Sequence, residues 1–129
     1  MADTKSKKIL IVDDEPDVVT YLSTLFEDNN YDIITAVNGK QAVAKAKSDK
    51  PDLITLDITM PEESGVRAFR DLQNDPETKS IPIIIVTGVT SDFKKFIESR
   101  KQVEPPTAYF EKPIDRERLL ETVKKLLGE

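Results

Sequence analysis

Short apolar runs alternate with segments of helical periodicity along this chain of 129 residues. The apolar runs are short enough to be strands. The most apolar of them, at 81–86, is predicted to be a strand that helices cover on both faces. The predicted strands lie at 8–12, 31–37, 52–57, 81–86 and around 109–110. Strands that alternate with helices in this way predict an α/β fold with a doubly wound parallel sheet.

The helical segments differ in how well their apolar positions repeat. The segment that begins at Pro16 has apolar residues at i, i+1, i+4, i+7 and i+8, and the last segment has a comparable pattern after an Asp115 N-cap. The fourth segment, at about 91–103, has Arg100 where its next apolar turn should fall. We therefore expect the fourth helix to be the least firmly packed.

Acidic residues follow two of the predicted strands. Asp57 ends the strand at 52–57, and Asp13 and Asp14 follow the strand at 8–12. The carboxyl ends of parallel strands meet at one edge of a sheet, where ligands bind in folds of this class, so we expect these three carboxylates to share one crevice. Such a group repels itself unless a divalent cation neutralises it. The sequence therefore predicts a metal site with oxygen ligands.

Composition excludes several classes of function. The chain has no Cys and no His, which removes thiol chemistry, Cys-based zinc sites and the most common general base. A net charge of −5 argues against general affinity for nucleic acid or an anionic membrane. The polar residues 1–8 contain no signal peptide, and no apolar stretch reaches the ~20 residues of a membrane span. We expect a cytoplasmic protein with one domain at 8–129 after a disordered tail at 1–7.

Four blocks of sequence together resemble the receiver domain of two-component response regulators, in its single-domain form. They are Asp13-Asp14-Glu15-Pro16, the stretch 52–61 with Gly65, the stretch 83–88, and Lys112-Pro113. The resemblance implies a flavodoxin-like (βα)5 fold with strand order 2-1-3-4-5. It also implies an aspartate that accepts a phosphoryl group from a histidine kinase or phosphotransfer protein, with Mg²⁺ as the cofactor.

The resemblance assigns roles to the acidic residues. Asp57 matches the phosphoacceptor, because a carboxylate can form an acyl phosphate. Asp13, Asp14 and Asp57 match the metal ligands, with Asp14 direct and Asp13 partly through water, and the backbone carbonyl of Thr59 matches a further ligand. A simpler interpretation is also open, in which Asp57 caps a turn and the acidic pair favours the amino end of the first helix.

Further residues match the catalytic and switch positions of the family. Lys112 matches a lysine that reaches the phosphoryl oxygens, and Thr87 matches a catalytic hydroxyl that also acts in the switch. Tyr109 matches an aromatic residue that turns inward behind that threonine. Thr59 and Val89 match positions that govern how water reaches the acyl phosphate, and apolar Val89 predicts slow self-dephosphorylation.

The resemblance also implies the output. Phosphorylation would shift the face formed by helix four, strand five and helix five, which an unknown downstream protein would read. We expect no enzymatic activity beyond self-phosphorylation and self-dephosphorylation. We also expect no nucleic-acid or membrane partner. The protein should be a monomer or a phosphorylation-dependent homodimer. One segment departs from the family, since 103–108 reads Val-Glu-Pro-Pro-Thr-Ala where a Gly-Ala pair is usual.

The sequence leaves three alternatives to this function to consider. A flavin-binding electron carrier shares the fold, but the acidic residues after the first strand would repel the flavin phosphate. An aspartyl phosphatase needs a second acid two residues after its nucleophile, and that position holds Thr59. A receiver-like module that docks without being phosphorylated is the remaining alternative.

Overall fold

A computed structural model describes residues 7–58, 60, 64–87, 107–111 and 115–128. Its centre is a parallel sheet of five strands in the order β2-β1-β3-β4-β5. This order confirms the predicted flavodoxin-like topology. The chain elements are β1 (Lys8–Val12), α1 (Pro16–Asp28), β2 (Asp32–Ala36), α2 (Gly39–Asp49), β3 (Leu53–Leu56), α3 (Ser64–Asn74), β4 (Ile83–Thr87), β5 (Thr107–Glu111) and α5 (Arg116–Leu126).

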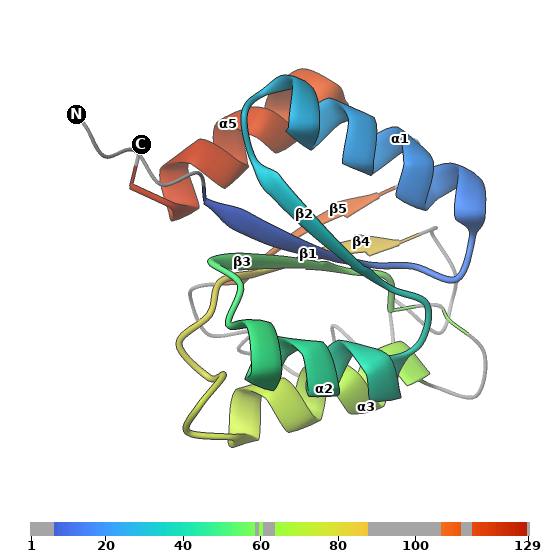
Figure 1. Ribbon diagram of the computed structural model, residues 1–129, viewed down its shortest axis with the longest axis vertical. Helices are drawn as coiled ribbons and strands as arrows, with labels where there is room; N and C mark the ends of the chain where they lie inside the picture. The colour runs from blue at the N-terminus through green and yellow to red at the C-terminus, as the bar shows by residue number, and fades with distance from the viewer. Residues whose placement is uncertain (1–6, 59, 61–63, 88–106, 112–114, 129) are drawn as a thin grey trace.

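Helices cover both faces of the sheet. Helices α1 and α5 lie on one face, and α2 and α3 lie on the other (Figure 1). Alternate residues of each strand enter opposite layers, so that in β1 Leu10 belongs to the core under α2 and α3 while Ile9 and Ile11 belong to the core under α1 and α5. Burial on both faces explains why the strands read as continuous apolar runs.

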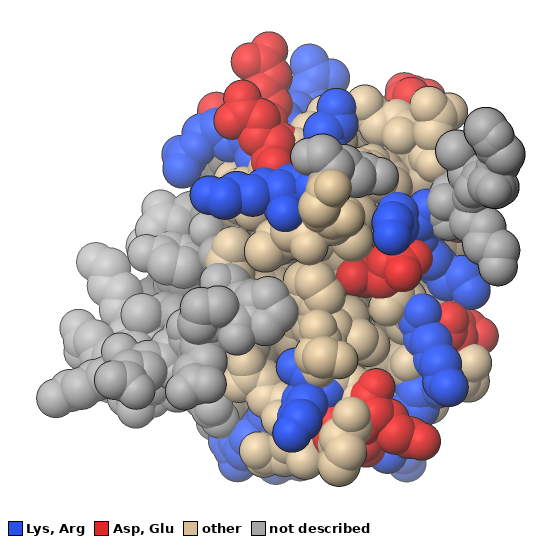
Figure 2. Space-filling view, turned by 90° about the vertical axis from the view of Figure 1, so that its left-hand side faces the viewer, with Lys and Arg blue, Asp and Glu red and all other residues tan. Residues whose placement is uncertain are grey.

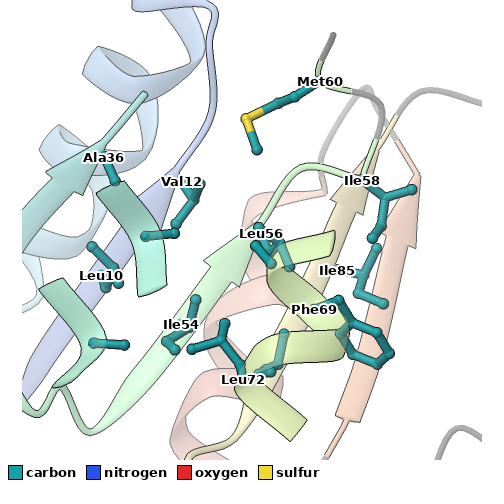
Figure 3. Close-up of a cluster of buried hydrophobic side chains, with 14 residues drawn as sticks. Leu10, Val12, Ala36, Ile54, Leu56, Ile58, Met60, Phe69, Leu72 and Ile85 are labelled. Carbon is teal, nitrogen blue, oxygen red and sulfur yellow. The ribbon is translucent and has the colours of Figure 1, made fainter. Parts of the chain in front are cut away.

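The core under α2 and α3 reaches the edge of the sheet where the strands end. Phe69 and Leu72 of α3 pack on the strand residues in Figure 3, and Met60 extends over the carboxyl end of β3. Ile58 and Met60 are buried although they follow the last residue of β3. The apolar core therefore supports the segment that directly follows Asp57.

Polar residues define where the helices begin. The Asn38 side chain accepts a hydrogen bond from the backbone N–H of Gln41 at 2.8 Å, which caps α2. Asp115 accepts from the backbone N–H groups two and three residues further on, so the predicted N-cap of α5 is confirmed. Pro16 is the first residue of α1, where its missing N–H costs nothing.

The boundaries of β4 differ from the sequence prediction. We expected this strand at 81–86, but it begins at Ile83. Pro82 has no N–H to donate to the ladder, so regular pairing starts after it. The predicted helix at 91–103, the unusual residues 103–106 and residues 1–6 of the predicted tail lie outside the described residues.

Thr55 gives a prediction about stability. Its side chain is buried in β3 beside Ile11 and Ile84 of the neighbouring strands, and within the described residues its hydroxyl has no hydrogen-bond partner. An unpaired buried hydroxyl lowers stability, so Thr55→Val is expected to raise the free energy of unfolding by about 1 kcal/mol. Urea denaturation measures this change.

Thr78 provides the matched control for that substitution. Its side chain is equally buried, but its hydroxyl donates a 2.7 Å hydrogen bond to the Leu72 carbonyl. Thr78→Val removes this bond and is expected to lower the free energy of unfolding by about 1–2 kcal/mol. Equal losses for the two variants would contradict the interpretation of Thr55.

Candidate functional site

The carboxyl edge of the sheet brings the predicted acidic residues together. The backbone N–H of Asp57 donates to the Val12 carbonyl at 3.0 Å, and the N–H of Asp13 donates to the Ala36 carbonyl at 3.1 Å. These bonds continue the pairing of β3 with β1 and of β1 with β2 one residue past the strands. The backbone that carries both carboxylates is therefore held by the sheet itself.

Four carboxylates form an acidic group at this edge. Ligand oxygens of Asp13, Asp14, Glu15 and Asp57 all lie within 4.8 Å of one another. Asp13 and Asp57 are each only 2% exposed, whereas Asp14 and Glu15 are exposed. Two unit charges at this separation repel by about 1 kcal/mol in water and by several times more where water is excluded. Such a group can hold a divalent cation that prefers oxygen ligands.

Glu15 was not among the metal ligands expected from the sequence. It is the N-cap of α1, and its backbone N–H donates to an Asp13 carboxylate oxygen at 2.9 Å. This local turn carries Glu15 back toward the acidic group. Its position directly after the acidic pair was the only signal in the sequence. The same hydrogen bond holds the Asp13 side chain against the N-cap residue of α1, and the simpler interpretation, in which the acidic pair favours the helix dipole, stays a prediction.

Gly65 packs against the backbone that leaves Asp57. A Cβ atom built on this glycine would lie 2.2 Å from the Asp57 carbonyl oxygen and 2.8 Å from Ile58 Cα. Such distances are far below any van der Waals contact, so only glycine fits this position. The first turn of α3 thus lies directly on the Asp57 peptide and limits its movement.

Other residues predicted for the site are only partly described. Thr87 ends β4 and Tyr109 lies within β5, and these neighbouring strands pair in parallel. The structure describes the backbone of these two residues but not their side chains. Thr59, Val89 and Lys112 lie outside the described residues. The roles expected for these five residues stay predictions.

A family comparison identifies the chain. The family model described as response regulator receiver domain matches residues 9–124. The chain belongs to the response regulator receiver family. Receiver domains are signalling modules of two-component systems and take phosphate from histidine kinases. This membership favours the signalling interpretation over the flavin carrier and the phosphatase.

Two similar proteins and one solved structure match this receiver over nearly their whole length. Protein PilH of Pseudomonas aeruginosa is 38% identical over 121 residues, which cover 94% of this receiver and 98% of PilH. The polar-differentiation response regulator DivK of Brucella anthropi is 36% identical over 123 residues, covering 95% of this receiver and 98% of DivK. The solved structure of the chemotaxis protein CheY4 of Vibrio cholerae matches with a TM-score of 0.81 and 31% identity, covering 95% of this receiver and 99% of that chain.

None of the helices that the structure describes is both long and apolar enough to cross a bilayer.

Proposed function

We propose that this receiver domain accepts a phosphoryl group on Asp57 from a histidine kinase or phosphotransfer protein, in the presence of Mg²⁺. The observation that carries the proposal is the buried Asp57 carboxylate, which lies within 4.8 Å of three other carboxylates at the carboxyl edge of the sheet. In the reaction an Asp57 oxygen forms a bond to phosphorus, and the bond from phosphorus to the donor atom breaks. The donor departs with the electron pair of that bond.

The acidic group fits a hard divalent cation. Its donors are all carboxylate oxygens, which are the ligands that Mg²⁺ prefers. We propose that Asp14 and Asp57 hold the ion directly and that the Thr59 backbone carbonyl completes the protein ligands. Asp13 would act partly through water, because one of its oxygens already accepts a hydrogen bond from the Glu15 N–H. When bound, the ion supplies positive charge beside the phosphoryl oxygens.

The protein's own contribution is positioning. The hydrogen bond to Val12 and the close contact with Gly65 hold the Asp57 peptide before any phosphoryl group arrives. A nucleophile held in place loses little further freedom in the transition state. We propose that Lys112 and Thr87 neutralise the remaining phosphoryl oxygens.

The output is proposed to follow from the same site. Thr87 and Tyr109 would change position after phosphorylation, and Thr59 and Val89 would limit the access of water to the acyl phosphate. A downstream protein would then read the face formed by the predicted fourth helix, β5 and α5.

Mass spectrometry after incubation with acetyl phosphate and Mg²⁺ tests the proposal. The expected product carries one added phosphoryl group, and digestion places it on the peptide that contains Asp57. Unchanged mass with acetyl phosphate and with histidine kinases supplied as donors would instead support the alternative of a receiver-like module that docks without phosphorylation.

The two neighbouring acids are expected to differ in metal binding. Asp14→Ala removes a direct ligand and should weaken Mg²⁺ binding by more than tenfold, whereas Asp13→Ala removes a water-mediated one and should weaken binding by about tenfold or less. Calorimetric titration measures both affinities, and acetyl phosphate labelling is expected to fall in the same order. Asp32→Ala, at an exposed acid of β2, is the control. The opposite order for the two variants would contradict the assignment of Asp14.

A further inference from the structure

Strand β2 forms one edge of the sheet. It pairs with β1 on one side, and within the described residues no strand pairs with its other side (Figure 1). An edge strand presents backbone groups with which another chain can pair. Three β-branched and partly exposed residues, Ile33, Ile34 and Thr35, make up its middle, and the strand contains no proline or glycine. The sequence of β2 itself therefore does little to prevent the addition of another strand.

The pairing with β1 fixes which backbone groups of β2 point outward. The Ala36 carbonyl accepts a hydrogen bond from the Asp13 N–H at 3.1 Å, so Ala36 directs its N–H and C=O groups toward β1. Successive residues of a strand direct these groups to opposite sides. Ile33, Thr35 and, just past the end of the strand, Val37 therefore direct theirs toward the open side.

Two side chains of α2 bind the outward groups at the carboxyl end of β2. The Gln41 side-chain oxygen accepts a hydrogen bond from the Val37 N–H at 3.1 Å, and Lys45 Nζ donates to the Thr35 carbonyl. Gln41 and Lys45 lie four residues apart in α2, so they occupy the same side of the helix. One helix thus supplies an acceptor and a donor side by side at the open edge.

These two side chains take the place of one residue of an added parallel strand. In a parallel ladder, one residue of the incoming strand accepts from an N–H of the edge strand and donates to the carbonyl two residues earlier. Gln41 accepts at Val37, and Lys45 donates at Thr35. An antiparallel strand that extends past Ile33 also needs the Thr35 carbonyl. Neither kind of strand can therefore pair along β2 while both side chains are in place.

The charge of Lys45 adds a second obstacle to strand addition. Its side chain is partly buried and its ammonium group lies on the backbone of β2. A strand from another molecule, placed about 4.8 Å from β2, would shut this ammonium group off from water. Burial of a charge without a charged partner is strongly unfavourable. Lys45 therefore opposes pairing even where its hydrogen bond to Thr35 breaks transiently.

Net charge alone does not protect this edge. The chain carries a net charge of −5, but acidic and basic residues are interspersed on the face at the amino ends of the strands (Figure 2). Exposed charges more than about 8 Å apart are largely screened at physiological ionic strength. Protection against strand addition must therefore come from groups at the edge itself.

We propose that Gln41 and Lys45 close the open edge of β2 and so keep two copies of this receiver from pairing through that strand. The excluded partner is a second copy because two β2 strands, antiparallel about a two-fold axis, would pair Ile33 of each copy with Thr35 of the other. That arrangement uses the outward groups of these residues on both copies. The role does not depend on phosphorylation, and it acts at the edge of the sheet opposite to β5.

Sedimentation equilibrium without a phosphodonor or Mg²⁺ tests the proposal. Lys45→Met removes the ammonium group but keeps a long side chain of similar helix propensity. We expect this variant to self-associate about tenfold more tightly than the parent protein, or more. Lys40→Met is the matched control, because Lys40 is an exposed lysine of the same helix and its loss changes the net charge equally. Lys45→Arg keeps a charged donor and is expected to restore the behaviour of the parent.

A single cysteine locates the contact. The chain has no cysteine, and in the proposed pairing Ile34 of one copy would lie directly opposite Ile34 of the other. Ile34→Cys combined with Lys45→Met is expected to form a disulfide-linked dimer under mild oxidation. The same cysteine combined with Lys40→Met is expected to stay largely unlinked at the same protein concentration.

Hydrogen exchange followed by nuclear magnetic resonance tests the edge without Lys45→Met, in case that variant does not fold. In the parent protein, the outward amides of Ile33 and Thr35 should exchange faster than the amide of Ile34, which points toward β1. Gln41→Ala should speed exchange at Val37 by about tenfold or more and leave Ile34 unchanged.

Several outcomes would overturn the proposal. They are a folded Lys45→Met variant that associates no more tightly than Lys40→Met, a disulfide that forms equally in both backgrounds, and a parent protein that already pairs through β2. Slow exchange of the Ile33 and Thr35 amides in the parent protein would also overturn it, because the edge would then be covered by something other than the two side chains of α2.

Discussion

Asp57→Asn is expected to abolish phosphorylation of this receiver. The amide has the shape of the carboxylate but is not a nucleophile under these conditions, so acetyl phosphate should label the parent protein and leave the variant unlabelled. Mass spectrometry of the intact protein after incubation with Mg²⁺ measures the labelled fraction. The expected change is from about one phosphoryl group per chain to less than about a hundredth of that, because the variant lacks the carboxylate nucleophile.

A second measurement on this variant reports on the acidic group. Without Mg²⁺, the variant has one fewer negative charge within 4.8 Å of three other carboxylates. Its free energy of unfolding should therefore rise by about 1 kcal/mol or more. Asp52→Asn is the matched control, because Asp52 is an exposed acid just before β3 whose carboxylate accepts a hydrogen bond from the Lys8 N–H. Labelling that persists in Asp57→Asn would refute the assignment of the phosphoacceptor.

Gly65→Ala is expected to destabilise the protein strongly although it adds a single methyl group. The added Cβ would lie 2.2 Å from the Asp57 carbonyl oxygen, and the neighbouring atoms are backbone, which cannot rotate away. Overpacking of this kind costs about 1–3 kcal/mol, and the upper end is expected here. Thermal unfolding should show a melting temperature lower by roughly 8–12 °C.

The same substitution should also slow phosphorylation, because α3 can accept a Cβ only by displacing the Asp57 peptide. The control is Gly128→Ala, which adds the same methyl group at a position where, among the described residues, no atom beyond the adjoining ones lies within 4 Å. That glycine has a φ of 74°, so the control carries only the cost of a left-handed backbone, about 1 kcal/mol. A Gly65→Ala variant as stable as the control would mean that the site segment is looser than the structure indicates.

Much of the fold could be predicted because local patterns and global topology agree. The apolar run at 8–12 is β1 as predicted, and the Asp115 N-cap begins α5. Parallel strands also have one carboxyl edge, so acids that follow two strands must lie near each other whatever the loops do. Asp13, Asp14 and Asp57 were therefore predictable as neighbours, and their membership of one acidic group is confirmed.

Other features depended on the distance between residues far apart in the sequence. The contact of Gly65 with Asp57 and the unpaired hydroxyl of Thr55 each arise from how separate elements pack. Periodicity states which side of a helix is apolar, but it does not state which neighbour that helix meets or how closely.

The sequence by itself thus determined the order of the elements, the two buried faces of the sheet and the edge at which the acids gather. Those properties follow from the periods of strands and helices and from strand direction. Only the tertiary structure decided that Glu15 joins the acidic group and that α3 lies directly on the Asp57 peptide. Those properties depend on atomic distances of a few ångströms between elements, which no local pattern encodes.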